Sequence, residues 1–146
     1  MRGHLVTRAD ELLYPVLCLA RDNSVSVAPT AADLCRCNAL AWFRNRYFDD
    51  LLLFDATATP YRVQSAELDT PLRGWGRLVA RAVNRQLIVA PALERVGPAS
   101  LDHARATAVE WLRRAPGFWQ ETYDLAEWEG LIAGAQRMEA LCGVFT

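Results

Sequence analysis

The sequence predicts a single α+β domain with a mainly antiparallel sheet of about five strands and with helices on one face. The chain has 146 residues, a length that suits one domain, which we expect to span residues 14–146 after an N-terminal arm of residues 1–13. Strand patterns occur in five segments, four of which form two hairpins, at residues 14–28 and 49–68. Helical patterns separate or follow the strands, giving the element order ββ-α-ββ-α-β-α-α.

The first hairpin pairs the apolar run of residues 14–20 with residues 25–28, which alternate between apolar and polar side chains. Thr30 and Asp33 then resemble a capping box, which predicts a helix that ends near Asn45. The apolar face of this helix is expected to hold Leu34, Cys37, Ala41 and Phe48.

The central hairpin begins with the fully apolar run Leu51-Leu-Leu-Phe54. Turn residues follow from Asp55 to Pro60, and residues 61–66 alternate between apolar and polar side chains. We therefore expect a deeply buried strand paired with a strand that has one face in solvent.

Four further elements follow the central hairpin. A helix is predicted over residues 71–84, with a proline at its first position, and a short apolar strand over residues 86–93. Ser100 caps a third predicted helix over residues 101–114, and Asp124 caps the last one. The last helix is expected to bury Trp128, Leu131, Ile132, Ala135, Met138 and Cys142.

The net charge of −1 is unevenly distributed along the chain. Residues 70–97 carry five arginines and one glutamate, whereas the segments before and after them are net negative. The near-neutral total argues against a general nucleic-acid binder, which would carry a strongly basic face. The helix predicted at 71–84 has a strip of arginines that is either a solvated face or a docking surface for an acidic partner or nucleic-acid backbone: Arg73, Arg77, Arg81 and Arg85.

Residues with catalytic or metal-binding chemistry are scattered along the sequence. Cys35 and Cys37 would point in nearly opposite directions on a helix, about 200° apart, so they cannot clamp one metal ion. His4 and His103 are the only histidines, and no nucleophile motif or phosphate-binding glycine loop is present. We expect no cofactor, no metal and no enzymatic activity, with all four cysteines free and with Cys37 and Cys142 buried.

The N-terminal sequence predicts the cellular compartment. Asp10 and Glu11 precede an apolar run of only about eight residues, which is too short for a transmembrane helix and lacks a signal-peptide cleavage site. We therefore expect a cytoplasmic protein with reduced thiols and no membrane contact.

Acidic and aromatic residues are interleaved between Phe118 and Glu129. Asp124 and Glu127 have a structural role in capping the last helix and in matching its dipole, and Trp128 is expected in the core. The remaining residues have the composition of a protein-binding surface, with an ordinary helix start as the alternative. The predicted partner-binding residues are Trp119, Glu121, Tyr123 and Glu129, extended by Asp49, Asp50 and Asp55 at the two ends of the first central strand.

The central hairpin resembles a pattern found in small bacterial immunity proteins. In those families a strand ends on Asp-x-x-Gly, the next strand begins Tyr/Trp-Arg-Val, and helices flank the pair. Here Tyr47-Phe-Asp-Asp50 precedes the apolar strand, Asp55 ends it without the following glycine, and Tyr61-Arg-Val begins the next strand. The resemblance implies a cytoplasmic antidote from a polymorphic-toxin or contact-dependent growth inhibition locus. Such a protein binds its cognate toxin domain, for example a basic nuclease, occludes the toxin's active site and does not itself contact nucleic acid.

Two other classes of function remain open on the sequence alone. A small-ligand-binding or regulatory α+β domain without catalytic activity would contain an enclosed apolar cavity with a few converging polar groups. A structural or assembly partner would form a homodimer through an edge strand of its sheet. The shape of the cavity tests the first class, and the adjacent genes discriminate best among all the classes, because an antidote is encoded beside its toxin.

Overall fold

The computed structural model of the chain describes residues 6–44, 46–69, 86–114 and 124–146. The strands are β1 (Thr7–Arg8), β2 (Val16–Leu19), β3 (Val25–Ala28), β4 (Arg36–Asn38), β5 (Leu52–Phe54), β6 (Pro60–Leu68) and β7 (Gln86–Arg95). The helices are the 3-10 helix η1 (Ala9–Glu11), α1 (Ala31–Leu34), α2 (Ala39–Phe43), α4 (Leu101–Arg114), α6 (Leu125–Gly134) and α7 (Met138–Val144). The helix predicted over residues 71–84, with its arginine strip, lies outside the described residues.

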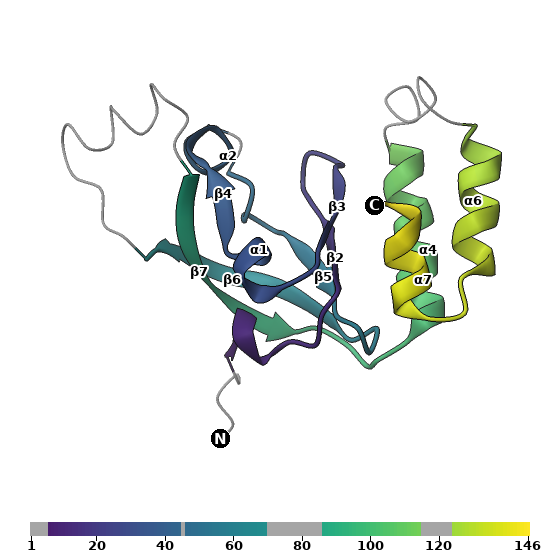
Figure 1. Cartoon of the computed structure of the whole chain (residues 1–146), viewed down its shortest axis with the longest axis horizontal. Coiled ribbons are helices and arrows are strands. Elements are labelled where there is room, and N and C mark those ends of the chain that lie inside the picture. The colour runs from purple at the N-terminus through teal and green to yellow at the C-terminus, as the bar shows by residue number, and fades with distance from the viewer. Residues whose placement is uncertain (1–5, 45, 70–85, 115–123) are drawn as a thin grey trace.

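The strands form one sheet in the order β1-β7-β6-β5-β2-β3, and β4 pairs with β7 as well (Figure 1). Every described strand pairing is antiparallel, so the predicted α+β class with a mainly antiparallel sheet is confirmed. Both predicted hairpins form: β2 pairs with β3, and β5 pairs with β6. The order of elements differs from the prediction at three places, which are described below.

Strand β2 is buried on both of its faces. Leu17 and Leu19 pack into a cluster with the helices α4, α6 and α7, whereas Val16 and Cys18 pack into a second cluster that contains Leu34 of α1. The three C-terminal helices therefore cover one face (Figure 1), and η1 and α1 contribute to the cover of the other. The expectation that all helices lie on one face is corrected accordingly.

The N-terminal arm predicted over residues 1–13 is part of the sheet from residue 7 onward. Thr7 and Arg8 pair with Leu93 and Ala92 of β7, so they extend the sheet as the short strand β1. Ala9 belongs to the buried cluster on the second face. The ordered structure thus begins before residue 14, because β7 is long enough to pair with a segment that has no strand pattern of its own.

The single helix predicted between Thr30 and Asn45 is instead two short helices separated by a strand. The predicted cap is present, since the Asp33 amide donates to the Thr30 hydroxyl at 3.2 Å. Residues 36–38 then leave the helix and pair with β7 as β4. Asn38 begins α2 by accepting the Ala41 amide with its side chain at 2.7 Å. Pairing with β7 and this second cap outweigh the helical periodicity of the segment.

The last predicted helix is broken into α6 and α7. Its predicted cap is present, because the Asp124 carboxylate accepts the Ala126 amide at 3.0 Å. The chain leaves the helical conformation at Ala135, whose carbonyl accepts a hydrogen bond from the guanidinium of Arg105 on α4 at 2.6 Å. Five of the six residues expected in the core of this helix are buried, but Leu131 is 54% exposed. The buried face of α6 holds Trp128 and Ile132, and Leu131 lies outside it.

Helix α4 matches its predicted bounds and ties the helices to the sheet. Ser100 caps it by accepting the His103 amide at 3.1 Å. Near the other end, the indole N–H of Trp111 donates to the carbonyl of Ala20, at the end of β2, over 2.8 Å. Both residues are buried, so this hydrogen bond lies inside the contact between the two layers.

We predict that Trp111→Phe lowers the free energy of unfolding by about 1 kcal/mol, because it removes this buried hydrogen bond, whereas the Ala20 carbonyl still accepts the Asn23 amide at 3.0 Å. Ala106→Ser, on the exposed side of the same helix, is the control and should change it by less than about 0.5 kcal/mol. Urea denaturation measures both. A loss in Trp111→Phe no larger than in the control would mean that this hydrogen bond does not contribute to the contact.

The cysteines are unpaired, and Cys37 and Cys142 are buried as predicted. Cys18 is buried as well, whereas Cys35 is half-buried. Burial raises the pKa of the Cys18 thiol to about 12 and that of the Cys37 and Cys142 thiols to about 11. These thiols therefore behave as small apolar side chains at neutral pH.

The raised thiol pKa values predict a loss of stability in alkali. A thiol whose pKa is higher in the folded state stabilises the fold fully below its unfolded value near 9.0 and loses that contribution as the pH rises toward 12. The free energy of unfolding should therefore fall between pH 9 and 11, and the slope should be shallower in Cys18→Ala. Equal slopes in the two proteins, measured by urea denaturation at constant ionic strength, would contradict this assignment.

Candidate functional site

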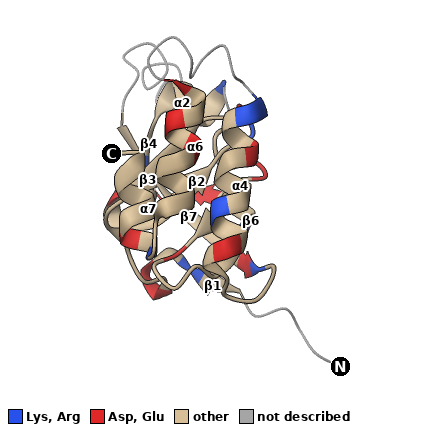
Figure 2. Cartoon of the chain, turned by 90° about the vertical axis from the view of Figure 1, so that its right-hand side faces the viewer, with Lys and Arg blue, Asp and Glu red and all other residues tan. Residues whose placement is uncertain are grey.

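The predicted partner-binding residues between 119 and 129 are only partly described. Trp119, Glu121 and Tyr123 lie outside the described residues. Glu129 lies on α6, where its carboxylate accepts two hydrogen bonds from Arg113 of α4, at 2.7 and 3.1 Å. The hydrogen bond from Arg113 lowers the pKa of Glu129 below its ordinary value. Glu129 is therefore a surface carboxylate with a partner in its own chain, on a helix pair whose α4 carries basic and acidic residues in turn (Figure 2).

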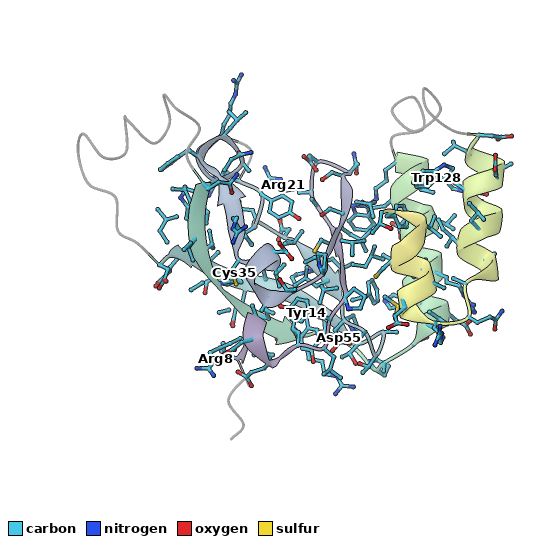
Figure 3. All side chains as sticks on the ribbon, in the orientation of Figure 1. Arg8, Tyr14, Arg21, Cys35, Asp55 and Trp128 are labelled. Atoms are coloured by element: carbon cyan, nitrogen blue, oxygen red, sulfur yellow. The ribbon has the colours of Figure 1, made fainter. Side chains whose placement is uncertain are left out.

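Asp55 is a turn residue and not part of an exposed acidic surface. It is only 4% exposed and lies at the turn after β5, near the helix layer (Figure 3). Its Oδ1 atom accepts hydrogen bonds from the Thr57 amide at 2.9 Å, the Thr57 hydroxyl at 2.6 Å and the Thr59 amide at 3.2 Å. These bonds hold the turn between β5 and β6. The prediction that Asp55 extends a partner-binding surface is therefore corrected.

Asp49 and Asp50 lie together on a pocket between the α2–β5 loop and β6. We call it the loop pocket. It has a volume of about 460 Å³ and opens to solvent. Its walls are Trp42, Phe43, Arg46, Phe48, Asp49 and Asp50 on one side and residues 63–66 of β6 on the other. Asp49 and Asp50 are thus two predicted site residues that the structure brings together in one pocket.

Three irregularities of the backbone meet at the loop pocket. Arg46 and Asp50 have φ values of 50° and 57°, in the left-handed region that non-glycine residues seldom adopt. Opposite them, the register between β6 and β7 shifts between Val63 and Ser65. Such conformations persist where surrounding contacts impose them, and both strained residues and bulges concentrate at functional sites. The pocket is therefore the strongest candidate site in the described part of the chain.

Hydrogen bonds fix the loop that carries the two carboxylates. The Asp49 amide donates to the Arg46 carbonyl at 2.9 Å, and the Tyr47 amide donates to the Ala41 carbonyl at 3.0 Å. Phe48, which is 2% exposed, anchors the loop in the core, with its ring centroid 6.2 Å from that of Trp42. The loop therefore presents its carboxylates from a defined backbone.

The two carboxylates of the loop pocket differ in their partners. Asp49 forms an ion pair with Arg46, with 2.9 Å between Oδ2 and Nε. Asp50 is exposed, and among the described residues it has no ion-pair partner. The pocket therefore carries two negative charges and one positive charge, and the negative charge of Asp50 is available to another molecule.

Residues 6–44, 46–69, 86–114 and 124–146 contain no group of three or more His, Cys, Asp or Glu side chains placed to hold a metal ion. In the same ranges, the helices are too short or too polar to cross a bilayer.

Comparison with known proteins gives no relative. The chain matches no family model, no curated protein and no solved structure.

Sequence reasoning identified the two acids of the loop pocket but missed its aromatic wall. The sequence patterns give no role to Trp42, and they place Phe48 on the face of a helix that ends at residue 43 in the structure. The available signal was the run Trp42-Phe-Arg-Asn-Arg-Tyr-Phe-Asp-Asp50, in which aromatic residues directly precede the acids.

We predict that the stability of the loop depends on the left-handed backbone at Asp50. Asp50→Val should lower the free energy of unfolding by about 1–2 kcal/mol, because a side chain branched at Cβ clashes with the backbone there. Asp50→Asn and Asp50→Gly tolerate this conformation and should stay within about 0.5 kcal/mol of the wild type. Thermal denaturation of all three variants is the measurement. If Val were tolerated as well as Asn, the backbone at Asp50 would not be constrained as described.

Proposed function

We propose that this protein is an immunity protein that binds a cognate bacterial toxin domain in the cytoplasm and neutralises it by occluding the toxin's active site. The observation that carries the proposal is the loop pocket, where the carboxylates of Asp49 and Asp50, on a loop of constrained backbone, lie beside the aromatic side chains of Trp42, Phe43 and Phe48. The pocket adjoins the β5–β6 hairpin, whose sequence resembles that of immunity proteins.

The chemistry of the surface suits an inhibitor. A protein that blocks an active site needs a rigid surface, because ordering flexible side chains and loops on binding reduces affinity. The loop pocket offers such a surface. The Asp50 carboxylate, which has no ion-pair partner among the described residues, would attract a basic toxin over long distances and speed the encounter. Aromatic side chains supply the anchoring contacts that dominate most protein interfaces.

Two acidic surfaces are available for this contact. One is the loop pocket, between α2 and β6. The other is the surface around Glu129 on α6, which lies at the far end of the molecule beyond the sheet (Figure 1). Glu129 is already paired with Arg113, whereas Asp50 has no such partner among the described residues. This difference favours the loop pocket.

A small-ligand-binding domain is the second candidate, and the size of the loop pocket favours it. About 460 Å³ falls within the range of ligand sites, roughly 300–1,000 Å³. However, the pocket opens to solvent and has charged walls, whereas a site for a small apolar ligand is expected to be enclosed. The open, charged shape fits a protuberance of a protein partner better.

We predict that the purified chain binds the product of the adjacent toxin gene with a dissociation constant below about 1 μM and suppresses its activity stoichiometrically. Isothermal titration calorimetry measures binding, and an assay of the toxin's activity at increasing ratios measures neutralisation. The control is the same chain after thermal unfolding, which should do neither. Absence of binding by the folded wild type would exclude the immunity function for that partner.

A further inference from the structure

The loop pocket has the chemistry of a receptor for one basic side chain. We propose that it receives an arginine side chain of the protein partner, with the guanidinium between the Asp50 carboxylate and the Trp42 indole. This inference rests on the proposed function and deepens it, because it names the group by which the partner is recognised.

The charges of the pocket select a cation. Arg46 already neutralises Asp49 through the ion pair at 2.9 Å. Asp50 is left as the exposed carboxylate on the rim, without an ion-pair partner in the described residues. An incoming anion would meet this carboxylate and be repelled. A cation would be attracted and could pair with it without displacing Arg46.

The aromatic wall and the polar groups of β6 favour a guanidinium over an ammonium. Trp42 is half-buried and lines the pocket, and indole is the best aromatic partner for a cation. A guanidinium is planar, stacks on aromatic rings and loses less hydration than an ammonium. It also has five N–H donors, for which Asp50, Gln64 and Ser65 place oxygen acceptors around the pocket.

The same chain contains the proposed arrangement elsewhere. On α4, the guanidinium of Arg114 lies 3.8 Å from the ring centroid of Trp111 and donates to the Glu110 carboxylate at 2.8 Å. A carboxylate, a guanidinium and an indole, all from the same helix, are thus in contact there. The loop pocket provides an indole and a carboxylate, and the partner's arginine would complete the set.

A small arginine probe tests the pocket without the partner. Nα-acetyl-arginine methylamide is titrated to tens of millimolar against the ¹⁵N-labelled chain, with the citrulline analogue as the uncharged control of the same shape. We expect saturable shifts at the Trp42 indole N–H and at the amides of Gln64 and Ser65 for arginine but not for citrulline. Asp50→Asn, which keeps the left-handed backbone and removes the charge, should weaken the binding at least threefold. Equal shifts with citrulline, an unchanged affinity in Asp50→Asn or no saturable shift would overturn the proposal.

The partner itself supplies the second arm. Asp50→Asn should raise the dissociation constant of the complex at least tenfold, while a control that also removes one exposed negative charge, Asp22→Asn, changes it less than twofold. Tight binding by the wild type with no loss in Asp50→Asn would overturn the proposal and leave the immunity function standing. Arginine-selective probe binding without any binding of the partner would support the pocket's chemistry and reject that partner.

Discussion

Strands β2 and β5 are buried on both faces, and this burial determines how the other elements are arranged. Alternate side chains of these neighbouring strands enter two separate clusters, with Leu17 and Phe54 on one side and Cys18 and Leu53 on the other. Other elements must cover the apolar side chains on each face, because leaving them exposed to water costs free energy. The C-terminal helices cover one face, and the N-terminal residues with α1 cover the other, so residues from both ends of the chain complete the core.

The loop pocket gains its rigidity from this constraint. Asp50 directly precedes Leu51, which is fully buried, and the Val63 amide donates to the Leu51 carbonyl at 3.0 Å. The loop is thus fixed at its end by a strand that cannot shift without exposing both clusters, and at Phe48 by the core. Residues with positive φ persist when their surroundings impose the conformation. The sheet therefore stabilises a strained loop and places its carboxylates at the rim of a pocket.

Local signals in the sequence predicted the elements that depend on local physics. The two hairpins and the caps at Thr30, Ser100 and Asp124 follow from turn and capping residues. Elements that depend on distant partners were missed, such as β4, which exists because β7 pairs with it. Asp50 and Asp55 show the limit for the site. Both flank the same strand, yet one is exposed on a pocket rim and the other is buried in a turn. Only the tertiary structure distinguishes them.

In the proposed complex, a protein partner covers the loop pocket. Hydrogen–deuterium exchange of the chain alone and in complex with the product of the adjacent gene tests it directly. We expect slower exchange on complex formation in peptides that cover residues 41–51 and 61–67, and unchanged exchange in residues 125–134 of α6. Protection confined to α4 and α6, with unchanged exchange around the loop pocket, would mean that the partner does not bind there.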